Sequence, residues 1–148
     1  MPTLAVNPRA KFDYEIIETY EAGIVLVGHE VKSVKTGKIS IKSAYVIISK
    51  GEALLINANI PPYQPKNVPA EYQSDRTRKL LLNKSEIKEL IGKTQQKGLT
   101  LVPIRVYTKK GKIKIEIGLG KGKKKIDKRE TIKKRETERD IARTLKNY

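Results

Sequence analysis

The stretch LTLVPIRVYTKKGKIKIEIGLG, residues 99–120, decides the fold class of this chain. Between Lys112 and Ile117, charged side chains alternate with isoleucines, which is the period-2 pattern of a strand with one buried face. Lys110-Gly111 divides the stretch into halves, and a glycine at that position suits a tight hairpin turn. The stretch therefore predicts an antiparallel β-hairpin.

The first half of the chain predicts further β structure. Residues 13–60 are consistent with three or four strands, because short apolar runs are separated by glycines and charged residues. Lys50-Gly51 predicts a second tight turn between two of these runs. The runs are AGIVLVG (22–28), SAYVIIS (43–49) and EALLINANI (52–60).

One main helix is predicted, within LLLNKSEIKELIGKTQQKG, residues 80–98. Asn83 followed three residues later by Glu86 is a capping pattern, and Gly98 provides the stop. Before this helix, PPYQPKNVPAEYQSD (61–75) is rich in proline and predicts an irregular surface segment.

The order of strands, helix and strands predicts a mainly β fold. A sheet of short antiparallel strands leaves exposed edges unless it closes on itself, and a barrel removes those edges. We therefore expect residues 1–120 to form an OB-fold-like closed antiparallel barrel with one main internal helix. Barrels of this kind are common among nucleic-acid binders.

Residues 121–148 differ in composition from the rest of the chain. They contain 12 Lys or Arg against 5 Asp or Glu, and their large aliphatic residues are too widely spaced to form one face of a helix. These aliphatic residues are Ile126, Ile132, Ile141 and Leu145. The composition predicts a basic C-terminal tail that is disordered when free and helical when bound.

The formal net charge of +16 indicates an anionic partner. Lys and Arg that meet phosphates release condensed counterions, so nucleic acid is the first expectation and an anionic membrane surface the second. The chain has no cysteine, which excludes disulfides and thiolate metal sites. It shows no secretory signal and no apolar run near the roughly 20 residues of a membrane helix. A cytoplasmic protein is predicted.

Few residues favour catalysis. His29 is the only histidine in the chain, and Glu30 is its only acidic neighbour in the sequence. A general base needs a partner and a pocket, and the acidic residues do not cluster with metal-ligand spacing. We therefore expect no catalytic residue, no cofactor and no metal. The alternative, an enzyme acting on RNA, would require turnover that depends on His29 or Glu30.

Basic residues just before the predicted helix favour RNA as the partner. Arg76, Arg78 and Lys79 are placed to bind backbone phosphates, although a solvated run of charges fits the composition about equally well. Tyr63 and Tyr72, in the proline-rich segment, are freer to stack on bases than the tyrosines within predicted strands.

Three segments together resemble one protein family. They are AVNPRAKFDYEIIETYEAGIVLVGHEVKSVKTGK (5–38), DRTRKLLLNKSEI (75–87) and KGKKKIDKRETIKKRE (121–136), and they are similar to the SmpB family of SsrA-binding proteins. The resemblance implies a non-enzymatic RNA chaperone that acts in rescue of stalled bacterial ribosomes. An OB-fold barrel would bind the tRNA-like domain of transfer-messenger RNA (SsrA). The basic tail would enter the 16S rRNA decoding centre and the empty mRNA channel of the ribosome. Elongation factor Tu would take part indirectly, through charged transfer-messenger RNA.

The resemblance also implies residue roles. In the barrel, contacts to transfer-messenger RNA would come from Asn7, Glu21, Glu30, Lys32, Ser33, Leu81 and Asn83, in addition to the basic residues before the helix. In the tail, ribosome contacts would come from Lys121, Gly122, Lys123, Lys124, Asp127, Lys128, Arg129, Lys133, Lys134 and Arg135. The chain departs from the family pattern at Phe12, where His is common, and at Ile126, where an aromatic residue or His is common.

Two acidic residues are unexpected in a basic RNA binder. Glu21 and Glu30 would accept hydrogen bonds from base amino or ribose hydroxyl groups, or they would be structural partners of a neighbouring Arg or Lys. The alternative to the rescue factor as a whole is a generic OB-fold RNA-binding or ribosomal protein, which composition alone does not distinguish from it.

Overall fold

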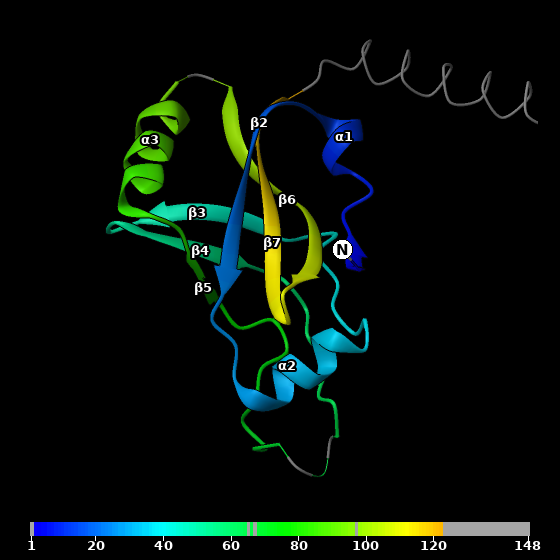
Figure 1. The fold of residues 1–148 in the computed structure, drawn as a ribbon. Helices are drawn as coiled ribbons and strands as arrows, with labels where there is room; N and C mark the ends of the chain where they lie inside the picture. The colour runs from blue at the N-terminus through cyan, green and yellow to red at the C-terminus, as the bar shows by residue number, and fades with distance from the viewer. Residues whose placement is uncertain (1, 65, 67, 97, 123–148) are drawn as a thin grey trace, which may run out of the picture.

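The computed structural model describes residues 2–64, 66, 68–96 and 98–122, and its chain forms a sheet of seven strands with three helices among those residues (Figure 1). The elements in chain order are β1 (Thr3–Val6), α1 (Ala10–Asp13), β2 (Tyr14–Ile24), α2 (Gly28–Lys35), β3 (Tyr45–Ser49), β4 (Glu52–Ile56), β5 (Arg78–Leu81), α3 (Lys84–Thr94), β6 (Leu99–Lys109) and β7 (Lys112–Gly122).

Both predicted hairpins are confirmed. β6 and β7 pair antiparallel up to Lys109 and Lys112, and β3 and β4 pair up to Ser49 and Glu52. Each turn has two residues with positive φ: 51° at Lys50 with 74° at Gly51, and 52° at Lys110 with 78° at Gly111. Two consecutive left-handed residues define the hairpin turn whose twist matches that of the strands, and glycine adopts that conformation without steric cost.

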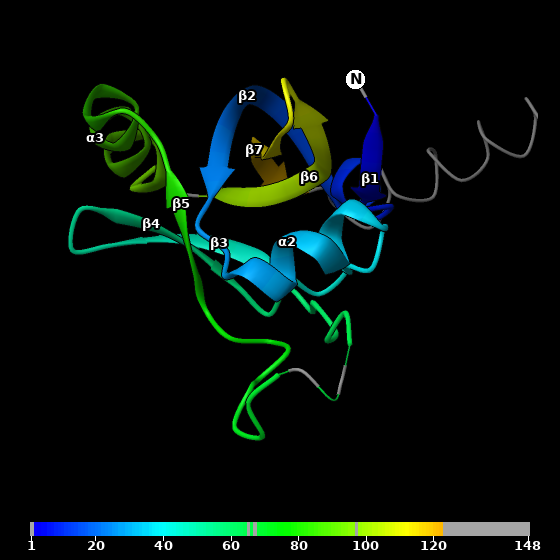
Figure 2. The same cartoon turned by 60° about the horizontal axis from the view of Figure 1, so that its bottom comes forward.

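The sheet closes into the expected antiparallel barrel. β6 pairs with β3 and β7, β2 pairs with β5 and β7, and β4 lies between β3 and β5. The ring therefore runs β6-β3-β4-β5-β2-β7 and returns to β6, while β1 is added along β6. β2 and β6 curve strongly as they pass around the barrel (Figure 2). Closure pairs both edges of the long strands, as expected for a small β domain.

Alternating aliphatic residues fill the interior of the barrel. Leu55, Ile115 and Ile117 are fully buried, and α3 contributes Leu90 to the same core. At Gly118, a Cβ atom would lie 2.8 Å from Cδ1 of Ile104. Glycine at this position therefore lets β7 approach the side chains of β6 closely.

The structure corrects the expectation of strands alone between residues 13 and 60. Strand β2 ends at Ile24, and α2 begins at Gly28, within the run expected to be a strand. The carboxylate of Glu30 accepts a hydrogen bond from the backbone N–H of Val27 at 3.0 Å, which is half of a capping box. A short apolar run bounded by glycines suits a strand equally well, so this helix start was missed.

The segment predicted to contain the main helix, residues 80–98, begins with a strand. Leu80 and Leu81 belong to β5, where they pair with β2 and β4, and α3 starts at Lys84. The expected cap is confirmed, because Glu86 accepts a hydrogen bond from the backbone N–H of Asn83 at 3.1 Å. Tertiary pairing decided the conformation of a leucine run that favours helix by propensity.

Strand β7 continues two residues past the predicted end of the barrel. Lys121 pairs with Glu15 of β2 and with Leu99 of β6, and Gly122 pairs with Tyr14. The remaining residues of the predicted tail, 123–148, lie outside the described residues.

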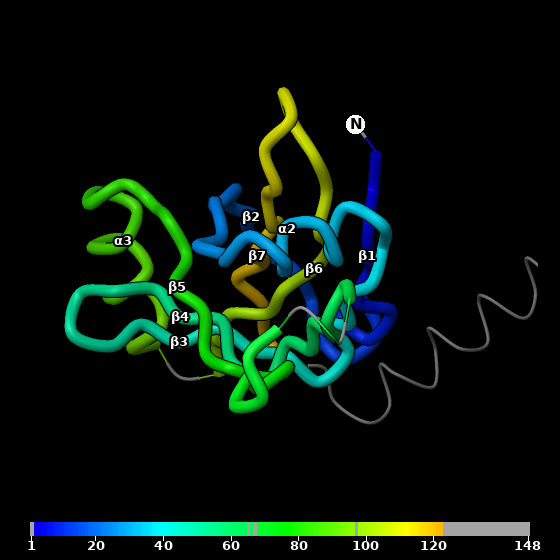
Figure 3. Tube along the Cα trace, turned by 90° about the horizontal axis from the view of Figure 1, so that it is seen from below, coloured from blue at the N-terminus to red at the C-terminus, as the bar shows by residue number. Residues whose placement is uncertain are grey.

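The helices divide between the two ends of the barrel. α2 and the segment after β4 lie at the end where the β6–β7 hairpin turns, and α1 and α3 lie at the opposite end (Figure 1). Seen from the first end, α2 crosses in front of β7 (Figure 3). In the part of the chain that the structure describes, no helix is both long and apolar enough to cross a bilayer.

Candidate nucleic-acid interface

Three of the predicted contact residues meet on the outside of the barrel. Gly23 of β2 faces Leu81 of β5 across the ladder; Glu21 lies two residues before Gly23 on β2, and Asn83 lies two residues after Leu81, between β5 and α3. Since side chains alternate between the faces of a sheet, these residues share one side. All are exposed except Gly23, and Leu81 exposes 54% of its surface. Lys79 lies two residues before Leu81 on β5. We call Glu21, Lys79, Leu81 and Asn83 together the β2–β5 surface.

Glu21 is held in place by its neighbours. The hydroxyl of Tyr107 donates to one carboxylate oxygen, and Nζ of Lys109 lies 3.5 Å away. The hydrogen bond from Tyr107, together with the charge of Lys109, lowers the pKa of Glu21. Burial and the same hydrogen bond raise the pKa of Tyr107 to about 12. The carboxylate is ionised and exposed, so it keeps lone pairs free for a base amino group or a ribose hydroxyl.

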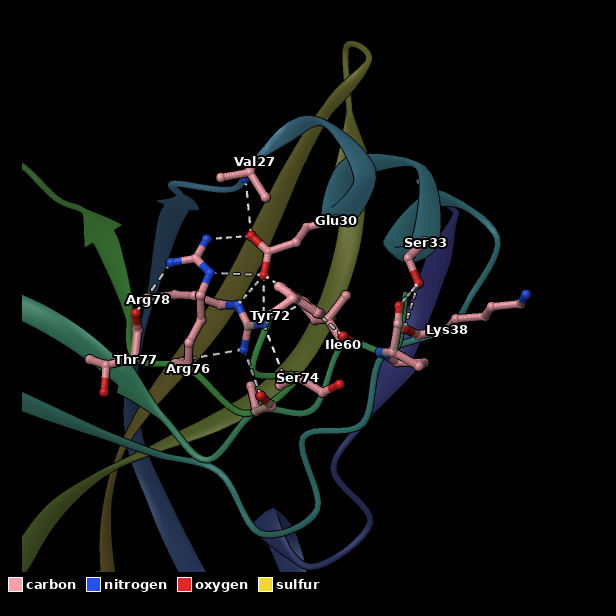
Figure 4. Close-up of polar contacts among 12 residues, drawn as sticks. Val27, Glu30, Ser33, Lys38, Ile60, Tyr72, Ser74, Arg76, Thr77 and Arg78 are labelled. Atoms are coloured by element: carbon pink, nitrogen blue, oxygen red, sulfur yellow. Dashed lines mark hydrogen bonds and ion pairs between the residues drawn. The ribbon is translucent and has the colours of Figure 1, made fainter. Parts of the chain in front are cut away.

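Glu30 lies inside the protein at the centre of a polar cluster (Figure 4). Its Oε2 accepts from Nη2 of Arg78 at 2.6 Å and from Nε of Arg78 at 3.0 Å. Arg76 donates to both carboxylate oxygens, and the Tyr72 hydroxyl lies 3.0 Å from Oε2. We call Glu30, Tyr72, Arg76 and Arg78 the Glu30 cluster. It joins α2 to β5 and to the irregular segment before it.

The cluster leaves few donors unused. Arg78 also donates to the backbone carbonyls of Ala58 at 2.6 Å and Ser74 at 2.9 Å, and its side chain is fully buried. Burial alone raises the pKa of Glu30, but hydrogen bonds from Arg76, the Val27 backbone and Arg78 outweigh it and lower the pKa to about 2. A fully satisfied buried network of this kind fixes the conformation of the segments that it joins.

Several predicted contact residues therefore have structural partners. Glu30 pairs with both neighbouring arginines, as in the alternative expected for it, and the side chain of Arg78 is fully buried. Ser33 is buried and donates to the carbonyl of Pro61 at 2.6 Å. The hydroxyl of Tyr72 is engaged in the cluster.

The other predicted residues of the barrel lie apart from one another. Asn7 is buried, and its amide donates to the carbonyl of Pro103 at 2.9 Å. Lys32 is exposed on α2, and Lys79 is exposed beside Glu52, with 3.3 Å between Nζ and Oε1. The side chain of Arg76 keeps 32% exposure. Of the tail residues, Lys121 is exposed at the end of β7; the residues from Lys123 onward lie outside the described part.

His29 does not form a catalytic pair with Glu30. Its ring packs edge-on against Tyr72, with 4.5 Å between ring centroids, while the Glu30 carboxylate faces the two arginines. Nδ1 of His29 is buried and has no hydrogen-bond partner among the described residues. Within residues 2–122 as described, no group of three or more His, Asp or Glu side chains is placed to hold a metal ion.

Sequence reasoning missed part of this surface. Val25 and Val27, which follow β2, expose 45% and 47% of their surface next to β5, where the N–H of Val25 donates to the carbonyl of Lys79 at 2.9 Å. They were missed because the run 22–28 was expected to be a strand of the barrel. Their exposure extends the apolar area around Leu81.

Comparisons with known proteins agree with this architecture. The sequence model of the SmpB protein family matches residues 4–147. An SsrA-binding protein of Trichormus variabilis is 51% identical over 142 residues, covering 96% of this chain and 92% of that protein. An SsrA-binding protein of Enterococcus faecalis is 51% identical over 144 residues, covering 97% of this chain and 93% of that protein.

A solved structure extends the likeness to three dimensions. A chain from "tmRNA-SmpB: a journey to the center of the bacterial ribosome" is 48% identical, with a TM-score of 0.66, and the match covers 81% of this chain and 84% of that one. The family match spans nearly the whole sequence, and the closed barrel is shared with a member of that family. The chain described here belongs to the SmpB family.

Proposed function

We propose that the protein is an RNA-binding ribosome-rescue factor, which binds the tRNA-like domain of transfer-messenger RNA and delivers it to stalled ribosomes for trans-translation. One observation carries this proposal: the chain is 48% identical, over 81% of its length, to a protein in a structure of transfer-messenger RNA with SmpB on the ribosome. The net charge of +16 is the electrostatic signature of a partner rich in phosphate.

The β2–β5 surface is the proposed reader of the RNA. Glu21 and Asn83 supply polar groups that hydrogen-bond base edges or ribose hydroxyls, and Leu81 supplies an exposed apolar contact. Lys32, Lys79 and Arg76 are accessible enough to bind phosphates. Asn7, Glu30, Ser33 and Arg78 act indirectly, because their hydrogen bonds hold the segments around this surface.

The tail has a separate proposed role. Residues 123–148 contribute 11 Lys or Arg against 5 Asp or Glu, and they follow directly on the last barrel strand. We propose that they bind 16S rRNA in the decoding centre and the empty mRNA channel, with Lys124, Lys128 and Arg129 among the contacts. The role needs no catalytic step of the protein's own. Elongation factor Tu takes part only through the charged RNA, and ribosomal action places the protein in the cytoplasm.

An equilibrium titration tests the proposal. Full-length protein and protein ending at Gly122 are titrated with transfer-messenger RNA and with a competing tRNA, each at two salt concentrations. Tight binding that prefers transfer-messenger RNA and survives the truncation supports the proposal. Binding that ignores RNA identity, and weakens in proportion to the charge removed, supports a generic OB-fold RNA-binding or ribosomal protein instead.

A further inference from the structure

A pocket of about 350 Å³ opens beside Leu81, at the end of the barrel nearest α2. Four elements line it: the end of β2, α2, β5 and the β6–β7 hairpin. Its apolar wall includes Ile24, Leu26 and Val31 together with Leu81. Its volume is within the range of small-ligand sites. We call it the Leu81 pocket.

Glycine at position 23 sets the shape of the pocket wall. A Cβ atom on Gly23 would lie 3.4 Å from Cβ of Leu81 and 3.5 Å from its Cδ1. Leu81 therefore packs directly over the β2 backbone. Because Leu81 belongs both to the pocket and to the β2–β5 surface, an RNA on that surface reaches the pocket opening.

The charged residues in the pocket lining are all cations. Lys35 lies in the last turn of α2, and Lys112 and Lys114 lie on β7. Lys35 and Lys112 are exposed and Lys114 is half-buried. Among the described residues, no ion pair within 4.0 Å engages any of the three. An apolar cavity with unpaired cations around it complements a group that has a flat apolar face and flanking negative charge.

We propose that the Leu81 pocket receives one unstacked nucleobase of transfer-messenger RNA, and that Lys35, Lys112 and Lys114 bind the phosphates on either side of it. An unstacked base in a loop has apolar faces to bury, and the backbone phosphates of its nucleotide lie on either side of it. This combination matches an apolar pocket with lysines around it. This inference rests on the proposed function and names the feature of the RNA that the barrel reads.

Cysteine footprinting tests occupancy directly, because the chain has no cysteine of its own. Val31→Cys puts a single thiol in the pocket, and Ile47→Cys puts one on the outer face of β3, where Ile47 is 38% exposed. The rate of alkylation by N-ethylmaleimide is measured on the full chain, with and without saturating transfer-messenger RNA. We expect the RNA to slow the Val31→Cys reaction at least about tenfold, by excluding reagent from a filled site, and to leave Ile47→Cys unchanged.

Filling the pocket gives a second test. Val31→Phe fills the space that the base would occupy, so the Kd for transfer-messenger RNA should rise roughly 5- to 150-fold, the range for one lost specific contact. The dependence of binding on salt should not change, since no charge is removed. Circular dichroism and thermal unfolding confirm that the variant folds, and the footprint remains as an independent readout.

The lysines are tested by salt dependence. Changing Lys35, Lys112 and Lys114 together to Ala should reduce the slope of log K against log salt by about 2, because three phosphate contacts are lost. The matched control removes three exposed lysines elsewhere on the surface. These control changes are Lys42→Ala, Lys50→Asn and Lys88→Ala, with Asn at position 50 because its φ is 51°.

The outcomes separate the two proposals. If unmodified protein shows no preference for transfer-messenger RNA over tRNA, the proposed function fails. If the preference is present but the pocket thiol reacts at the same rate and Val31→Phe binds normally, only the pocket inference is overturned. Protection of the thiol by small ribosomal subunits, without protection by transfer-messenger RNA, also overturns it.

Discussion

Glu30 couples the stability of the fold to pH. Its pKa is about 2 in the folded protein against 4.5 for an unperturbed glutamate. A depressed folded pKa contributes stability above the unfolded pKa, and that stability is lost as pH falls from about 4.5 towards 2. The contribution is on the order of 3 kcal/mol at neutral pH. Urea unfolding across this pH range should show the loss.

Glu30→Gln should destabilise the fold at neutral pH by about 3–5 kcal/mol, because it leaves the buried guanidinium of Arg78 without its counter-charge. The variant should also lose much of the acid dependence below about pH 4.5. Glu52→Gln is the control: its side chain is 51% exposed and pairs with Lys79 at the surface, so the change should cost less than about 1 kcal/mol. Equal costs for both changes would mean that the buried cluster is not the source of stability.

Asn83 lies on the proposed RNA-binding surface without a place in the core. Asn83→Ala should weaken binding of transfer-messenger RNA by about 1–3 kcal/mol, the cost of one lost specific contact. Its effect on folding should be about 1 kcal/mol, because alanine loses the side-chain half of the capping box but retains the backbone N–H that donates to Glu86. Filter binding and urea unfolding on the same preparation compare the two effects. A loss of binding that tracks a loss of stability would remove Asn83 from the interface.

At the scale of elements, β7 depends on a glycine where three strands meet. A Cβ on Gly118 would lie 2.8 Å from Ile104 Cδ1 and 3.1 Å from Ile16 Cδ1. Gly118→Ala should therefore destabilise the barrel by about 1–3 kcal/mol through overpacking. Thermal and urea unfolding measure the change.

Gly92 in α3 is the matched control for this substitution. A Cβ there meets no atom within 4 Å, and the residue lies in the helix interior. Gly92→Ala should therefore stabilise the protein by about 0.5–1 kcal/mol, because alanine restricts the unfolded chain and favours helix. If both changes move stability in the same direction, the close packing at Gly118 is not what selects glycine.

At the scale of the whole molecule, truncation should separate the RNA-binding role of the barrel from the rescue role of the tail. Strand β7 ends at Gly122, so a chain ending there keeps every described strand. We expect it to bind transfer-messenger RNA within about threefold of full-length affinity while losing trans-translation on stalled ribosomes. Lys128→Ala in the full chain should likewise spare RNA binding and impair rescue. The binding titration and a peptide-tagging assay in a reconstituted translation system measure the two activities. Lost RNA affinity on truncation would contradict the division of roles.

The barrel itself could be predicted from local patterns. Alternation of lysine with isoleucine in β7, and a Lys-Gly pair in each hairpin turn, act within a few residues, so they can be read from the sequence. The exposed Asn83 and Leu81 were assigned through the family resemblance. Helix α2 and strand β5 were missed, because short segments of this kind suit helix or strand and only their pairing partners decide between them.

The sequence by itself determined the fold class, the basic charge and the capping of α3, since each follows from composition or from neighbours in the chain, and the resemblance of three segments indicated the family. Only the tertiary structure decided which polar residues face the solvent. Glu30, Arg76 and Arg78 read as surface charges, yet both arginines, 46 and 48 positions away in the sequence, pair with the buried Glu30 because each satisfies the other's charge. The same folding left Glu21, Leu81 and Asn83 exposed on one side and opened a cationic pocket next to them. Burial of a charge depends on partners that are distant in sequence, and no local pattern records them.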